Sequence, residues 1–154
     1  MRRSTGLFNA ILAAERTAMA AGVIRLYATT SIPTSPNDAI PSGSTLIATI
    51  TVDGGAWAAG TSTNGLNFDA PVLNVLSKAA AETWRGTAVA AGTITWARFV
   101  SNSASDTGAS STTLSRIDFT VGISSGDLRL AKVTYAIGDL VQVTALTDTL
   151  TNIA

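Results

Sequence analysis

The sequence predicts an all-β protein, an antiparallel β-sandwich of Ig-like or jelly-roll-like type with about eight or nine strands, preceded by one α-helix. Short segments of alternating apolar and polar residues recur roughly every ten residues, a pattern typical of a β-sandwich or barrel. Stretches rich in Gly, Pro, Ser and Thr separate these segments. A helical pattern is convincing only at the N-terminus. We therefore expect residues 1–22 to form a helix that docks or caps, and residues 23–154 to form a single sandwich domain.

The predicted helix runs from Thr5 to Ala20. Its apolar residues follow one another in steps of three and four, which places them along one side of a helix. They are Leu7, Ile11, Ala14 and Ala18, with Phe8, Leu12 and Met19 on the adjoining strip. Ser4 or Thr5 can cap the first turn, and Gly22 can end the helix in a left-handed conformation. The apolar side is expected either to pack across an open end of the protein's own sheets or to insert into a neighbouring subunit.

Most of the segments that follow have the two-residue period of strands. The predicted strands are residues 23–29, 45–52, 66–70, 72–78, 116–121, 128–135 and 140–146. The segment 72–78 also fits a helix, and extended chain is favoured because Pro71 precedes it. Residues 30–44 hold three of the four prolines and predict a long loop. Ser101 to Ser111 contains almost no apolar residue and predicts an exposed loop tip.

Glu82 to Val100 is interpreted as a β-hairpin around which the other strands pack. Trp84 lies in its first arm and Trp96 in its second, and the small residues between the arms suit a short connection. Aromatic side chains bury the largest apolar area per residue, so both tryptophans are expected in the core.

The composition restricts the classes of partner. Charged residues make up only 13% of the chain, and the formal net charge is zero. Nucleic-acid binding is unexpected, because it normally needs clustered Lys and Arg. No run approaches the roughly 18 apolar residues of a membrane span, so no membrane contact is expected either. So few charges give a monomer little protection against self-association, and a homo-oligomer, such as a trimer, is expected.

Several catalytic and metal-binding classes lack their essential residues. The chain has no Cys and no His, which removes disulfides, thiol catalysis, Ser-His-Asp catalysis and the usual zinc ligands. No phosphate-binding glycine loop is present. A paired-carboxylate glycosidase stays formally open, with Glu82, Asp69, Asp118 and Asp139 as the acids to consider. Single carboxylates at turns are more often solvated or paired with arginine, so we predict a protein without enzymatic activity, cofactor or metal.

Parts of the chain resemble a group of small proteins encoded in the structural gene clusters of tailed bacteriophages. The similar segments are Ser4–Leu7, Gly22–Tyr27, Gly65–Pro71, Val75–Lys78, Glu82–Trp84 and Gly86–Ala88. Residues 132–154 fall outside this resemblance. The resemblance implies a virion component, assembled in the host cytoplasm.

Two functions follow as expectations. The first is a capsid decoration or cement protein that stabilises the shell by contacts with itself and with the major capsid or other virion proteins. The second is a tail, fibre or head-fibre component that binds a host receptor or glycan. The expected partner-binding residues are Leu7, Phe8, Ile11, Leu12, Met19 and Trp57. Trp57 is the one tryptophan expected outside the core, and it would be the contact for a glycan.

Overall fold

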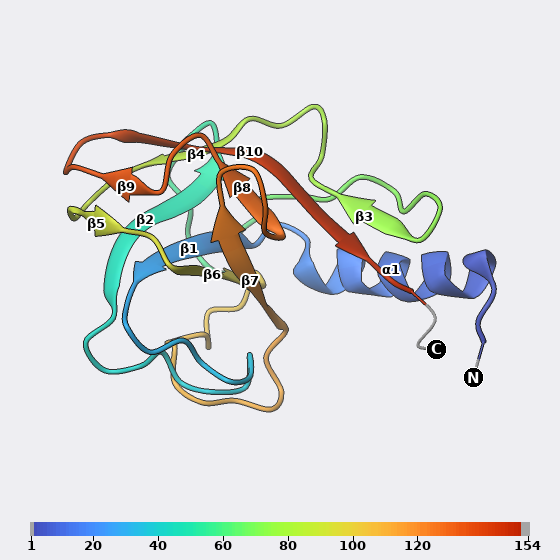
Figure 1. Ribbon diagram of the computed structural model, residues 1–154. Helices are drawn as coiled ribbons and strands as arrows, with labels where there is room; N and C mark the ends of the chain where they lie inside the picture. The colour runs from blue at the N-terminus through green and yellow to red at the C-terminus, as the bar shows by residue number, and fades with distance from the viewer. Residues whose placement is uncertain (1, 152–154) are drawn as a thin grey trace.

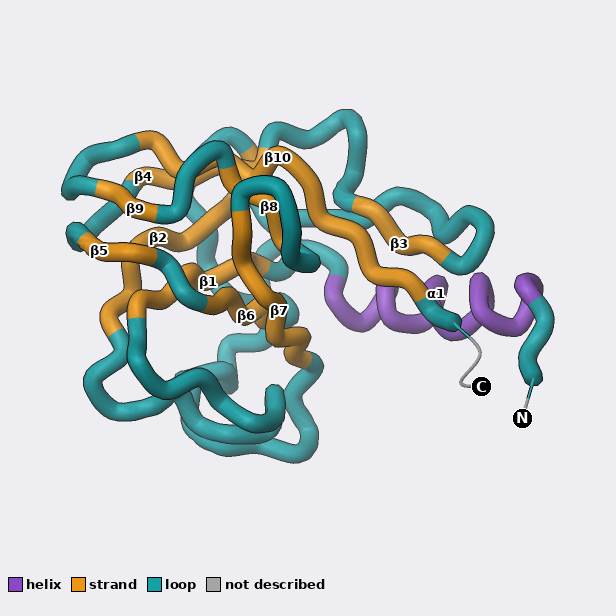
Figure 2. The backbone as a smooth tube through the Cα atoms, viewed as in Figure 1, coloured by secondary structure: helices purple, strands orange, loops and turns teal. Residues whose placement is uncertain are grey.

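The computed structural model describes residues 2–151 and consists of one helix and ten strands (Figures 1 and 2). The helix is α1 (Thr5–Met19). The strands are β1 (Val23–Ala28), β2 (Thr45–Val52), β3 (Val75–Ser77), β4 (Trp84–Thr87), β5 (Gly92–Thr93), β6 (Trp96–Val100), β7 (Arg116–Gly122), β8 (Leu128–Leu130), β9 (Thr134–Tyr135) and β10 (Leu140–Thr149). The prediction of a mostly β protein with one N-terminal helix is confirmed for this part of the chain.

The strands form a closed barrel rather than the predicted sandwich. Pairing runs in the order β10-β4-β2-β1-β6-β7-β8, and β8 pairs again with β10, so seven strands close on themselves. All these pairs are antiparallel except β7 with β8, which is parallel. The register of β10 shifts between Val143 and Ala145, and such a bulge bends a strand. Because β10 pairs with β4 before this shift and with β8 around it, one strand joins the two edges that a sandwich would leave open.

The predicted hairpin from Glu82 to Val100 is wrong. β4 lies between β10 and β2, whereas β6 lies between β1 and β7, so its two arms do not pair. The connection between them crosses one end of the barrel, where the N–H of Val89 donates to the carbonyl of Ile47 (2.8 Å) and β5 pairs with β9. Each arm finds a partner from a distant part of the chain, which local sequence cannot specify.

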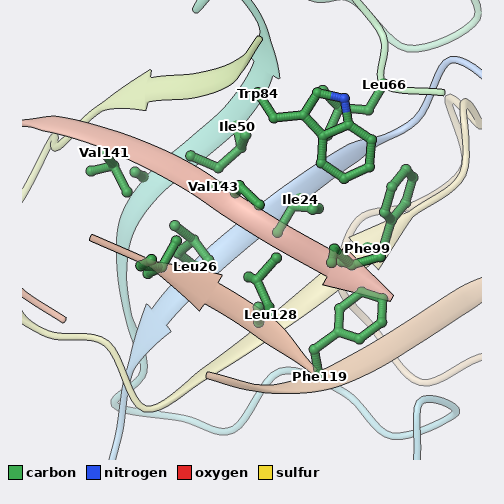
Figure 3. Close-up of a cluster of buried hydrophobic side chains, with 14 of the residues drawn as sticks. Ile24, Leu26, Ile50, Leu66, Trp84, Phe99, Phe119, Leu128, Val141 and Val143 are labelled. Carbon is green, nitrogen blue, oxygen red and sulfur yellow. The ribbon is translucent and has the colours of Figure 1, made fainter. Parts of the chain in front are cut away.

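The barrel interior holds one apolar core (Figure 3). Trp84 is fully buried there beside Phe68 and Phe99, with ring centroids 5.3 to 6.1 Å apart, as edge and stacked aromatic contacts prefer. Trp96 is also buried, as predicted, but outside this cluster, where it stacks on Tyr27 at 4.9 Å.

Two long loops cover the outer face of the barrel around β6. The first is residues 29–44, between β1 and β2, and the second is residues 101–115, between β6 and β7. Arg98 is fully buried there, and it donates to both carboxylate oxygens of Asp118 (2.7 and 2.8 Å) and to the carbonyl of Asp38 (2.8 Å). The loops also bind each other, because the N–H of Ile40 donates to the carbonyl of Gly108 (2.9 Å). One arginine thus holds the first loop on the strands.

The second loop is not the free tip that its polarity predicted. Asp106 lies within it and is only 8% exposed, because Arg116 donates to both of its carboxylate oxygens (2.8 and 2.6 Å). Burial alone would raise the pKa of Asp106, but hydrogen bonds from Arg116 and from the N–H of Gly108 lower it. A segment with almost no apolar residues is therefore held by a buried ion pair.

The junction between α1 and β1 sets the direction of the helix. Ser4 caps the helix, as expected, by accepting from the N–H of Leu7 (3.3 Å). At the other end Ala21, not Gly22, is left-handed (φ 57). Gly22 is required for a different reason: a Cβ there would lie 2.3 Å from the carbonyl oxygen of Val100. The direction of the helix therefore depends on the close approach of the Gly22 backbone to the Val100 backbone.

Gly22→Ala should lower the free energy of unfolding by at least about 1–3 kcal/mol, because backbone must move to admit the methyl group. The matched control is Gly6→Ala within α1, where the nearest atom to a new Cβ is the Ser4 hydroxyl at 4.0 Å. That change should raise stability by up to about 1 kcal/mol through helix propensity. Urea unfolding measures both. Equal effects of the two changes would contradict the close approach.

Arg116→Ala should cost about 3–5 kcal/mol in urea unfolding, because it leaves the Asp106 carboxylate buried without its partner. Arg85→Ala is the control, since Arg85 pairs with Asp53 at 3.5 Å where both side chains are exposed, and exposed pairs contribute at most about 1 kcal/mol. Similar losses from both variants would refute the structural role of the buried pair.

Candidate functional site

The helix α1 is held against the rest of the protein along only one side. It runs outward from the barrel, with β3 and the end of β10 lying along it (Figure 1). Phe8, Leu12 and Met19 form the held side, and each is at most 3% exposed. Two hydrogen bonds reinforce the contact, from the Arg16 guanidinium to the carbonyl of Phe68 (2.8 Å) and from the N–H of Asn74 to the side chain of Asn9 (3.0 Å).

A second side of α1 is apolar and exposed. We call Leu7, Ile11, Ala14 and Ala18 the helix strip. Leu7 is 49% exposed and Ile11 is 41% exposed, and both alanines are exposed. Of the two alternatives considered for the apolar helix, packing on the protein itself holds for Phe8, Leu12 and Met19, and insertion of the exposed strip into a neighbouring subunit stays a prediction. Of the predicted partner-binding residues in α1, only Leu7 and Ile11 are available to another molecule in this conformation.

Another apolar surface lies at the end of the barrel away from α1, near β5 and β9 (Figure 2). We call Val89, Ile137 and Leu140 the barrel-end patch, and their exposed fractions are 64%, 71% and 56%. Backbone bonds bring the three residues together, because the N–H groups of Ala88 and Gly138 donate to the carbonyls of Asp139 and Ala88 (2.9 and 2.8 Å). The sequence analysis did not predict this patch, although the sequence contains a sign of it. Leu140 and Val141 are consecutive and both apolar, so an apolar residue must lie on the outer side of β10.

Trp57 is half-buried, and its indole N–H donates to the carbonyl of Ala21 (2.9 Å). This bond supports the left-handed turn that ends α1. The ring also borders an open groove of about 390 Å³ on the outer face of β1, β2 and β4. The groove is otherwise lined by Arg25, Thr49, Thr51, Gly54, Gly55, Gly86 and Thr87. It offers hydroxyl groups, one cation and an aromatic edge.

The four carboxylates considered for a glycosidase are each engaged in a separate contact. Glu82 accepts from the Trp84 indole (2.7 Å) and from Asn67 (2.8 and 3.0 Å). Asp69 accepts from the N–H of Ala80, Asp118 binds Arg98, and Asp139 binds Lys132 at 2.6 Å. The structure does not bring them together as a pair.

A different carboxylate pair joins α1 to β10. Glu15 faces Asp148 across a cavity of about 240 Å³ that Asp118 and Asp127 also line. Burial, and then the charge and hydrogen bonding of Asp148, raise the pKa of Glu15 to about 7. Glu15 is thus protonated in part near neutral pH, which lessens its repulsion from Asp148. Within residues 2–151, no group of three His, Cys, Asp or Glu side chains is placed to bind a metal ion.

Comparisons with protein-family models, curated proteins and solved structures found no match. In the part of the chain that the structure describes, no helix has the length and hydrophobicity needed to cross a membrane. The function must be argued from the surfaces themselves.

Glu15→Gln should change how stability depends on pH. The folded pKa of Glu15 (about 7) lies above its ordinary value of 4.5, so the folded state binds the extra proton and wild-type stability falls as pH rises between these values. The amide removes this loss, so the variant should be more stable than wild type at pH 8 and similar at pH 4. Urea titrations at a series of pH values measure the difference. Asp53→Asn, which removes a carboxylate that is 63% exposed, is the control, and the same pH profile in wild type and Glu15→Gln would contradict the assignment.

Proposed function

We propose that the chain is a structural protein of a bacteriophage virion, and specifically a capsid decoration protein that stabilises the shell by protein–protein contacts. The observation that carries this proposal is the presence of two exposed apolar surfaces, the helix strip on α1 and the barrel-end patch beside β5 and β9. Figure 1 shows α1 and these two strands at opposite ends of the protein. A molecule that cements a shell must contact at least two neighbours. The resemblance to proteins of tailed-phage structural gene clusters supplies the kind of assembly.

The polar surface supports the same proposal. Charged residues are only 13% of the chain, and two of its arginines are buried in ion pairs with Asp118 and Asp106. Exposed apolar groups on a surface with few charges favour association over solubility. Charged residues are also depleted at the centre of protein–protein interfaces.

The number of apolar side chains sets the binding free energy that each surface can contribute. Burying one Leu, Ile or Val side chain contributes roughly 1.5–3 kcal/mol, so a surface of two or three such residues supports only weak binding alone. Repetition over a shell raises the effective affinity, since each copy is held at several contacts together. The closed barrel suits this use because it has no open sheet edge to deform between the two surfaces.

The partners under this proposal are other copies of the chain, with a trimer among the expected forms, and the major capsid or other virion proteins. The protein would be assembled into the virion in the host cytoplasm. It needs no cofactor for this role, since contact area alone supplies the stabilisation.

A second candidate is a tail, fibre or head-fibre component that binds a glycan. The observation that favours it is the open groove beside Trp57, because sugars bind where an aromatic ring adjoins hydrogen-bonding groups. The indole N–H is already bound to Ala21, so only the ring could contact a sugar.

Purified protein should bind empty shells of the encoding phage and raise their melting temperature. Ile137→Asp, in the barrel-end patch, should weaken binding at least tenfold in a co-sedimentation assay, because it buries a charge in the contact. Ile123→Asp is the matched control, since Ile123 is 57% exposed on the turn between β7 and β8, outside both surfaces. It should bind as the wild type does.

Two outcomes would count against decoration. If wild-type protein neither binds nor stabilises shells, the proposed function is wrong. If it also binds a sugar on a glycan array, and Trp57→Ala abolishes that binding, the second candidate replaces it.

A further inference from the structure

We infer that two copies of this chain pair through α1, with the helix strip of one copy packed antiparallel on the helix strip of the other. The strip consists only of Leu7, Ile11, Ala14 and Ala18. The nearest ionisable groups in the middle of the helix do not obstruct this contact. Glu15 lies beside Asp148 and Arg16 donates to the carbonyl of Phe68, so both side chains have partners within the protein's own body. A second helix could therefore approach without burying an unpaired charge.

The order of large and small residues in the strip selects the partner and its direction. Both large side chains lie in the first half of α1, and the alanines lie in the second half. In an antiparallel pair with the helix ends aligned, Leu7 of each copy faces Ala18 of the other, and Ile11 faces Ala14. Large residues then meet small ones along the whole contact, which allows close packing. A parallel pair would place Leu7 on Leu7 and Ala18 on Ala18, leaving a gap at one end.

Self-complementarity of this kind is what a twofold contact requires, because each residue pair occurs twice. The strip therefore fits a second copy of this chain in particular. A trimer cannot be closed by a twofold contact, so a trimer would form through another surface and the helix pair would then link two trimers.

The position of the barrel agrees with the antiparallel direction. The barrel adjoins the C-terminal end of α1, and the N-terminal end points away from it (Figure 1). Antiparallel helices place the two barrels at opposite ends of the pair, whereas parallel helices would bring the barrels side by side. The charges agree as well, because Arg2 precedes α1 and would lie near the negative C-terminal end of the partner helix.

The length of the contact sets its strength. A helix of 15 residues is about 22 Å long. The area that one strip along it can bury is smaller than the area buried in a standard stable dimer. The pair should therefore be weak in dilute solution and populated when copies are crowded. The inference rests on the proposed function only for this crowding on a shell, and the contact itself can be tested without a shell.

Cysteine cross-linking tests the pair directly, because the chain has no cysteine of its own. Full-length Leu7→Cys and Ala18→Cys proteins are made, one labelled with heavy isotopes, then mixed in equal amounts at high concentration and oxidised. Disulfides form only when Cβ atoms come within about 4.5 Å. Mass spectrometry should show the mixed dimer well in excess of the statistical proportion. Ala13→Cys, exposed on another side of α1, replaces Ala18→Cys in the control mixture and should give only the statistical proportion.

Two results would overturn the inference. One is a mixed dimer no more abundant than in the Ala13→Cys control. The other is preferential linkage of Leu7→Cys to itself, which would indicate parallel helices. A mixture of Ile11→Cys and Ala14→Cys proteins repeats the test with the inner pair and should also give the mixed dimer in excess. If cross-linking fails while wild-type protein still stabilises shells, only the helix pair is wrong. If cross-linking succeeds and shells are not bound, only the proposed function is wrong.

Discussion

Closure of the barrel by β10 is the constraint on which the rest of the structure depends. Its successive parts pair with β4, β8 and β3, so this one strand completes the barrel and then continues along α1. Closure gives every barrel strand a paired neighbour on both sides, whereas a sandwich would leave open edge strands. Exposed apolar side chains then favour association, and those of the helix strip and the barrel-end patch lie on α1 and at the far end of the barrel.

Both apolar surfaces follow from how the chain enters and leaves the barrel. Gly22 lets the helix end pass close to Val100, and Trp57 binds Ala21 at the same turn. This direction puts Phe8, Leu12 and Met19 against the protein and turns the helix strip outward. At the other end, the crossing between β4 and β6 meets the turn before β10, and Val89, Ile137 and Leu140 are left exposed. The covering loops are held instead by the buried arginines Arg98 and Arg116, and Ile32 is exposed on the first of them.

Sequence reasoning succeeded where the information is local. Steps of three and four residues located α1, and alternation located β1, β2, β7 and β10, because both patterns depend on neighbouring residues. The predicted strand 66–70 forms only isolated bridges, at Leu66 and Phe68. It failed where distant segments choose one another. The arms of the expected hairpin pair with other strands, and the sandwich closes into a barrel through a bulge in β10. It could not tell which side of α1 would be buried, because Leu7 and Phe8 are equally apolar and only the direction of the helix decides between them.

The central claim is that this protein stabilises a viral shell through apolar surfaces at its two ends. A density map of the virion at side-chain resolution tests the claim most directly. We predict this barrel on the outer surface of the shell, with Ile137 and Leu140 against a capsid subunit and α1 against another copy of the chain. Density for the barrel only at the tail or fibres, with both surfaces open to solvent, would contradict the claim.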